Sequence, residues 1–222
     1  MYVIFDMDGV IADSEAVYLA GYLHAAELYD LPAADMREAV RRATGVTDEM
    51  ERQIMEETFG HLPQFDMDRT YRACRAYFAS VVETGRMQLK PGAVEILQFL
   101  KEEGVPVGLA SSSPRAMIEK VLGRHEVLPY FDVVVSGDMV VRSKPDPEIF
   151  LLCASRLGVP EAAFGETYVI EDSYNGIRAA HAAGMVPVMV PDQLPADGEM
   201  RQKAAVMASL EEAREWLAER LG

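Results

Sequence analysis

The sequence predicts an α/β protein built on a doubly wound parallel sheet, with an all-helical domain inserted into it. Short apolar runs alternate with segments of helical periodicity along most of the 222 residues. The region from about residue 14 to residue 85 differs, because it shows helical patterns only. Half of the residues are hydrophobic, which is enough to bury a core in a chain of this length.

The first expected strand is Tyr2–Phe5, an apolar run that is too short for a helix and ends in an acidic turn. A continuous apolar run of this length fits a parallel strand that is buried on both faces. Similar runs recur later in the chain, at residues 105–110, 133–135, 168–170 and 186–190.

Helical patterns alternate with these runs. Residues 92–101 carry Val94, Leu97 and Leu100 at helical spacing, after Pro91 and before Gly104, which are typical of a helix start and a helix end. Similar patterns occupy residues 147–157, 174–183 and 210–221. Alternation of strands and helices predicts a parallel sheet with helices on both faces.

The inserted region offers four helical stretches, near residues 14–29, 35–43, 48–58 and 68–83. The last stretch carries an apolar stripe that predicts core packing, formed by Tyr71, Cys74, Phe78, Val81 and Val82. We therefore expect a helical domain at residues 14–85 and an α/β domain made of residues 1–13 and 86–222.

The net charge of −15 and the pI near 4.7 exclude one class of partner. A polyanion such as DNA or RNA would be repelled. Small phosphorylated substrates remain possible, because a local cluster of cations and a metal ion can override the overall field. Cys74 and Cys153 lie far apart in helical patterns, so we expect two small core residues in a reducing compartment.

The N-terminal segment lacks the basic region and long apolar run of a signal peptide. No apolar stretch approaches the roughly 20 residues that a bilayer-spanning helix needs. We therefore expect a cytoplasmic protein without a membrane partner.

Two aspartates follow the first expected strand, in the motif Asp-x-Asp-Gly at residues 6–9. Ligands of open parallel sheets bind outside the carboxyl ends of the strands, so Asp6 falls where a site is expected and Asp8 can reach the same site. An acidic turn and a calcium loop are the alternatives. An EF-hand requires glycine at its sixth position and glutamate at its twelfth, where this chain has Ile11 and Val17.

Three serines, Ser111, Ser112 and Ser113, follow the expected strand at residues 105–110. A hydroxyl group and free backbone N–H groups suit a phosphate oxygen. Ser113 also precedes Pro114, a residue that is favoured in the first helical turn, so it is a candidate helix cap. Both interpretations are compatible, with Ser113 capping and Ser111 binding.

Lys144 lies in the segment Ser-Lys-Pro-Asp-Pro at residues 143–147. Most lysines are solvated surface charges. Here two prolines stiffen the local chain, and a lysine that is held in this way can be directed at a phosphate dianion in a dry site.

Glu171 and Asp172 follow the expected strand at residues 168–170. Adjacent carboxylates repel each other unless a cation compensates them. Oxygen ligands suit a hard ion, and magnesium is the usual one where phosphate is present.

Together the four motifs supply two aspartates, a serine, a lysine and an acidic pair, in that order. This pattern resembles the haloacid dehalogenase superfamily, and within it the β-phosphoglucomutase and phosphoglycolate phosphatase-like subgroup. The resemblance covers the whole chain, and the helical insert corresponds to the cap domain of that subgroup. It implies a Rossmann-like core and an enzyme that hydrolyses phosphoric monoesters.

The resemblance also implies roles for the motif residues. Asp6 is expected to attack phosphorus and form an aspartyl-phosphate. Asp8 is expected to protonate the leaving oxygen and then to activate the water that breaks the intermediate. Ser111, the N–H group of Ser112 and Lys144 are expected to hold the oxygens of the transferred phosphoryl group.

The implied cofactor is Mg²⁺. The resemblance assigns it to Asp6, the backbone carbonyl group of Asp8, and Asp172, with Glu171 binding directly or through water. The implied partner is a small phosphorylated metabolite, such as a sugar phosphate.

Several branches of the superfamily are excluded or disfavoured. Halide-removing members lack the second aspartate, which is present here as Asp8, and phosphonate-cleaving members use a cap lysine, whereas the first lysine of this chain is Lys90. Phosphosugar mutases carry a histidine ten residues after the acid/base aspartate and an arginine in a cap loop. Tyr18 and Asp48 stand at those places, so we expect a phosphatase, with a β-phosphoglucomutase-like mutase as the alternative.

A phospho-accepting signalling receiver domain is the alternative from another class, because it also combines an acidic cluster, an aspartate and a lysine on an α/β sheet. A receiver has no helical insert after its first strand, and its acceptor aspartate lies on a later strand. A catalytically retired scaffold is disfavoured because every motif residue is present. The sequence does not fix the oligomeric state, and a monomer is the default expectation.

Overall fold

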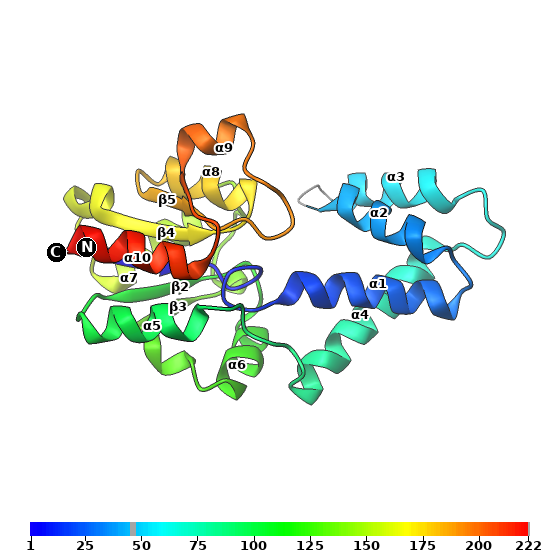
Figure 1. The fold of residues 1–222 in the computed structure, drawn as a ribbon, viewed down its shortest axis with the longest axis horizontal. Helices are drawn as coiled ribbons and strands as arrows, with labels where there is room; N and C mark the ends of the chain where they lie inside the picture. The colour runs from blue at the N-terminus through cyan, green and yellow to red at the C-terminus, as the bar shows by residue number, and fades with distance from the viewer. Residues whose placement is uncertain (45–47, 222) are drawn as a thin grey trace. The chain divides into compact units, whose positions relative to one another are not determined.

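The computed structural model describes residues 1–44 and 48–221. They form two compact units, of which one comprises Met1–Asp13 and Gln88–Gly222 and the other comprises Ser14–Met87. Figure 1 shows the elements of both units. In the described part of the chain, no helix combines the length and the apolar character that a membrane span needs.

The first unit is built on a six-stranded sheet with the strand order β3-β2-β1-β4-β5-β6. All neighbouring strands pair in parallel. The strands are β1 (Tyr2–Phe5), β2 (Val107–Ala110), β3 (Val133–Val135), β4 (Thr167–Glu171), β5 (Val186–Met189) and β6 (Ala205–Val206). The chain builds outward from β1 on one side and then crosses to build outward on the other side, so the predicted doubly wound α/β class is confirmed.

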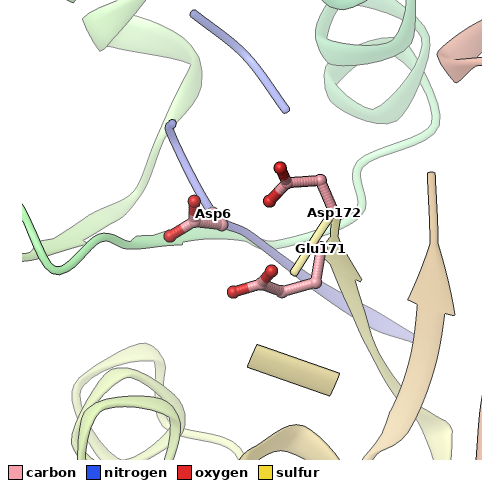
Figure 2. A group of neighbouring side chains, drawn as sticks. All are labelled: Asp6, Glu171 and Asp172. Atoms are coloured by element: carbon pink, nitrogen blue, oxygen red, sulfur yellow. The ribbon is translucent and has the colours of Figure 1, made fainter. Parts of the chain in front are cut away.

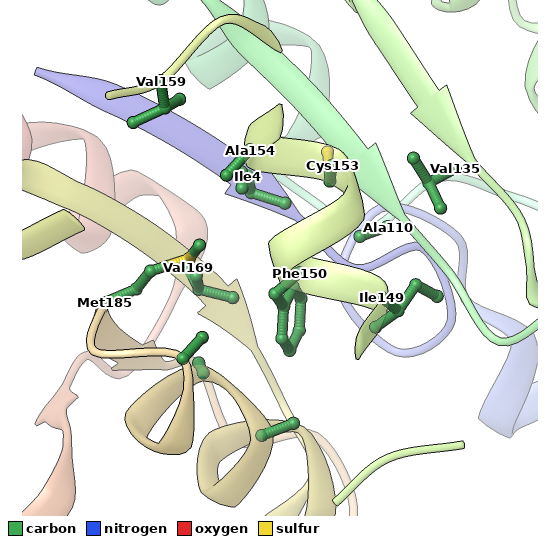
Figure 3. Close-up of a cluster of buried hydrophobic side chains, with 13 residues drawn as sticks. Ile4, Ala110, Val135, Ile149, Phe150, Cys153, Ala154, Val159, Val169 and Met185 are labelled. Carbon is green, nitrogen blue, oxygen red and sulfur yellow. The ribbon is translucent and has the colours of Figure 1, made fainter. Parts of the chain in front are cut away.

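One face of this sheet is covered by α7 (Glu148–Leu157) and α8 (Tyr174–Ala182). Figure 3 shows Phe150 and Cys153 of α7 among sheet residues that include Ile4 and Val169. These four side chains are fully buried. Strands that are covered on both faces can be apolar at every position, which explains why their sequences show continuous apolar runs.

The opposite face is covered by α5 (Ala93–Glu102) and α10 (Leu210–Leu221), which pack against each other (Figure 1). The remaining elements of this unit are α6 (Arg115–Arg124), α9 (Gly198–Lys203), and the 3-10 helices η1 (Leu128–Tyr130), η2 (Gly137–Met139) and η3 (Glu161–Glu166). The strands and helices expected from the sequence in this unit are all present, whereas α6, α9 and β6 were not predicted.

The second unit consists of the helices α1 (Ser14–Leu28), α2 (Ala33–Ala43), α3 (Asp48–Phe59) and α4 (Met67–Thr84). Helix α1 packs along α4, and the unit has its own core, which includes Met36, Met55 and Phe59. Cys74, Phe78, Val81 and Val82 of the predicted α4 stripe are buried, and Tyr71 is partly buried. Cys74 and Cys153 are both buried and free, in agreement with the core role predicted for them.

Candidate active site

The chemically distinctive motifs of the sequence meet at the carboxyl edge of the sheet. Asp6 follows β1, Ser111 follows β2, and Glu171 ends β4. Strand β1 lies between β2 and β4, and β4 is where the chain restarts on the other side of β1. This is the topological switch point at which open α/β sheets bind ligands.

Lys144 lies between two buried carboxylates. Its Nζ is 2.6 Å from Asp6 Oδ1 and 2.7 Å from Glu171 Oε1. It also donates to the carbonyl oxygen of Ala110, at 3.2 Å. The side chains of Lys144, Asp6 and Glu171 are only 7%, 9% and 1% exposed. The lysine of the proline-rich segment therefore points into the sheet edge and not into solvent.

Asp6, Glu171 and Asp172 form a cluster of oxygen donors (Figure 2). Each offers a carboxylate oxygen, and the three oxygens lie within 4.8 Å of one another. Ser173 holds the other oxygen of Glu171 in place. Glu171 Oε2 accepts hydrogen bonds from the N–H and the hydroxyl group of Ser173, both at 2.9 Å. A set of carboxylate oxygens suits a hard divalent cation such as Mg²⁺.

The charges of this cluster also fit a bound cation. Burial raises the pKa of Asp6 to about 7, against the attraction of Lys144, which lowers it. Burial alone would lower the pKa of Lys144, but attraction to Asp6 and Glu171 outweighs burial and holds the pKa above its usual range. The charged lysine compensates one carboxylate of the cluster. A bound cation would balance the others.

Asp8 is half-buried and is held by the serine loop after β2. Its Oδ2 accepts hydrogen bonds from Ser113 Oγ at 2.8 Å and from Ser111 Oγ at 3.3 Å. The expected capping role of Ser113 is wrong. Helix α6 begins with Pro114 at its N-cap and has no side-chain cap, because the hydroxyl group of Ser113 is directed at Asp8. The Ser112 side chain is exposed in the same loop.

Two glycines bring backbone close to the acidic cluster. Gly9 has a φ of +73°, and a Cβ atom there would lie 2.2 Å from Asp172 Oδ2. A Cβ atom at Gly176, at the start of α8, would lie 1.8 Å from Glu171 Oε1. A side chain at either position would force a carboxylate of the cluster to move, since real Cβ contacts are essentially never this short.

Two residues used in the sequence-based choice between phosphatase and mutase lie in the helical unit. Tyr18 is on α1, where its ring centroid is 4.5 Å from that of Phe78, and it is 41% exposed. Asp48 is the first residue of α3. Residues 45–47 of the cap loop and the side chain of Asp48 lie outside the described part of the structure.

Sequence reasoning missed three sets of contacts at this edge. The hydrogen bond from Ser113 to Asp8 was masked by the capping interpretation, and the two from Ser173 to Glu171 have no distinct sequence signal. The third is an ion cluster in which Lys90 Nζ lies 2.8 Å from Asp192 Oδ1 and 3.7 Å from Asp13 Oδ1. Only the order of strand ends could have suggested that Asp192, just after β5, lies at the same edge.

A doubly wound sheet with buried charged and acidic side chains at its switch point is the arrangement of many α/β enzymes. The chain belongs to the haloacid dehalogenase-like hydrolases, because the sequence model of that family matches residues 1–184. The family identified from the motifs, and the prediction of an enzyme, are therefore confirmed.

Similar proteins of this family carry several activities in their names. The chain is 36% identical over 187 residues to a phosphorylated carbohydrates phosphatase of Thermotoga maritima, which covers 82% of this chain and 81% of the relative. It is 33% identical over 216 residues to the β-phosphoglucomutase of Bacillus subtilis, and this match covers 94% of this chain and 92% of the relative. A HAD family hydrolase of Deinococcus radiodurans, solved with bound phosphate and sodium, matches with a TM-score of 0.82 at 26% identity, covering 98% and 95%.

Proposed function

We propose that this protein is a Mg²⁺-dependent phosphatase that hydrolyses a small phosphorylated carbohydrate or similar metabolite through an aspartyl-phosphate on Asp6. The observation that carries the proposal is the buried group in which Lys144 contacts Asp6 and Glu171, with Asp172 completing an oxygen cluster. The relatives named for phosphatase activity on phosphorylated carbohydrates and for phosphosugar mutase activity support this substrate class.

The proposed reaction uses the two aspartates in the roles that the family resemblance implies. An oxygen of Asp6 attacks phosphorus, and the bond from phosphorus to the leaving oxygen breaks while Asp8 gives that oxygen a proton. Water then attacks phosphorus, Asp8 takes up its proton, and the bond to Asp6 breaks to release inorganic phosphate. Lys144 and Ser111 hold the phosphoryl oxygens and balance their charge.

The metal ion would be held by Asp6, Asp172 and the backbone carbonyl group of Asp8, with Glu171 bound directly or through water. When bound, Mg²⁺ supplies positive charge beside the phosphoryl oxygens. We further propose that the helical unit, residues 14–85, acts as a cap that excludes bulk water and selects the substrate.

The first prediction concerns this metal. Treatment with a chelator should abolish phosphate release, and added Mg²⁺ should restore it. Ca²⁺ should restore little activity, because it prefers more ligands at longer distances and disturbs the in-line geometry. The measurement is phosphate release from an aryl phosphate after each addition. Full activity of the chelated protein without added metal would contradict the proposal.

The choice of phosphatase over mutase rests on Tyr18 and Asp48, which replace the cap histidine and arginine expected of a mutase. It is supported by two described cations of the α/β unit, Arg115 and Lys90, which are paired with carboxylates. A mutase must bind a bisphosphate intermediate. In the loop after β2, the hydroxyl group of Ser113 is directed at Asp8, Pro114 has no N–H group, and Arg115 is paired with Glu119 at 2.7 Å. Lys90 is engaged by Asp192 and Asp13. Cations that are already paired favour a substrate with a single phosphate group.

The second prediction tests this choice. With β-glucose 1-phosphate, Mg²⁺ and a trace of the 1,6-bisphosphate, glucose 6-phosphate and free phosphate are followed together, alongside a panel of phosphorylated metabolites. Phosphate release should exceed isomerisation for at least one metabolite, because water reaches the intermediate after the product leaves. Rapid formation of glucose 6-phosphate, with no comparable hydrolysis of any metabolite, would replace the phosphatase by the mutase.

A further inference from the structure

One carboxylate oxygen of Asp8 accepts hydrogen bonds from two hydroxyl groups. Ser113 Oγ and Ser111 Oγ lie 2.8 Å and 3.3 Å from Asp8 Oδ2. The shorter distance is typical of a well-formed bond between a hydroxyl group and a carboxylate, whereas the longer one is weak. Ser113 is therefore the principal partner of Asp8 in the serine loop.

The backbone around Ser113 is fixed on several sides. Its N–H group donates to Ser111 Oγ at 3.0 Å, and its carbonyl oxygen accepts from the N–H group of Gly137 at 3.0 Å. The N–H group of Ser111 donates to the carbonyl oxygen of Val135, at 3.1 Å. A Cβ atom at Gly137 would lie 2.0 Å from the carbonyl oxygen of Ser112, so the two loops are in close contact. These contacts fix the backbone segment that carries the hydroxyl group of Ser113.

Once substrate is bound, Ser111 and Ser113 cannot both donate a hydrogen bond to Asp8. A serine hydroxyl group has a single hydrogen to donate. In the proposed reaction Ser111 directs this hydrogen at a phosphoryl oxygen, and its bond to Asp8 is lost. The hydroxyl group of Ser113 is then the donor from this loop that continues to hold Asp8.

We propose that Ser113 is a positioning residue, which holds Asp8 Oδ2 and thereby aims the other carboxyl oxygen at the leaving oxygen of the substrate. This inference rests on the proposed phosphatase reaction, in which Asp8 gives and takes the proton. Ser113 touches no reacting atom and acts through Asp8. Its loss should therefore matter most for substrates whose leaving oxygen must be protonated.

The test compares two leaving groups in Ser113→Ala. An alkyl phosphate such as a hexose 6-phosphate leaves as an alkoxide and needs the proton, whereas 4-nitrophenyl phosphate leaves as a stable phenolate and does not. The value of kcat/KM, which reports formation of the intermediate, should fall about 10- to 100-fold for the alkyl phosphate, a part of what a positioned acid contributes. It should fall less than about threefold for 4-nitrophenyl phosphate by the same reasoning.

Three further variants make the test specific. Ser113→Thr keeps the hydroxyl group and should restore the alkyl phosphate rate, which also separates loss of the contact from misfolding. Ser155→Ala makes the same chemical change at an exposed position of α7 and should alter neither rate. In an Asp8→Ala background, Ser113→Ala should add no further loss, since the two residues act as one unit.

Two results would overturn the inference by itself. One is an equal loss for both substrates in Ser113→Ala, which would indicate a role in phosphate binding or in folding. The other is a full additional loss in the Asp8→Ala background. A wild-type protein that releases no phosphate from either substrate would instead contradict the proposed function, and the inference would fall with it.

Discussion

Replacement of Asp6 by asparagine should lower phosphatase turnover by about three orders of magnitude or more, as expected when a nucleophile is removed. The amide has nearly the same shape but does not attack phosphorus, and it removes one anionic oxygen from the cluster with Glu171 and Asp172. The protein should remain folded, because Lys144 keeps Glu171 as an ion-pair partner at 2.7 Å. Phosphate release and the thermal unfolding midpoint are the measurements.

The matched control is Asp35→Asn, the same chemical change at an exposed residue in the first turn of α2. It should leave turnover unchanged. If Asp6→Asn retained activity within tenfold of the wild type, the assignment of Asp6 as the nucleophile would be wrong.

Replacement of Lys144 by methionine should have the largest effect on stability. The ammonium group lies between Asp6 and Glu171, and all three side chains are nearly inaccessible to water. Its removal leaves two buried carboxylates without their counter-ion, which costs about 3–5 kcal/mol in comparable buried pairs. The unfolding midpoint of the metal-free protein should fall clearly, and turnover should be lost because the phosphoryl group loses a cation.

Magnesium provides an internal check on this result. Mg²⁺ should raise the unfolding midpoint of Lys144→Met by more than that of the wild type, because the ion replaces part of the missing positive charge. The control is Lys203→Met, which removes a more exposed lysine 3.8 Å from Glu199. Such pairs contribute little, so its midpoint should barely move. An equal effect of the two replacements would contradict the role of Lys144 as a buried counter-ion.

The long elements of the fold could be predicted from the sequence because each carries a strong pattern. Strand β1 and helix α10 were predicted with the bounds that the structure shows. Strand β6 has two residues and is defined by pairing with β5, where Val188 faces Ala205. Helix α9 has six residues. Elements this short hold too few residues to show a period, and their conformation depends on contacts with distant parts of the chain.

The location of the candidate site was predictable for a different reason. Carboxyl ends of parallel strands meet at one edge, so the order of the motifs along the chain already implied a common place for Asp6, Ser111 and Glu171. Contacts between individual side chains were not predictable. Ser113 lies 105 positions from Asp8 in the sequence, and a local helix-capping role competed with the true contact in any reading of neighbouring residues.

The glycines beside the acidic cluster set a limit on how this chain can vary in evolution. Gly9 and Gly176 carry no functional group, yet a methyl group at either one would occupy the space of Asp172 or Glu171. Substitution of either glycine by alanine would displace the neighbouring carboxylate. The glycine therefore cannot change first while the carboxylate keeps its position. The active site therefore depends on two positions that provide only space for the carboxylates. These two glycines should change in evolution as slowly as the carboxylates beside them.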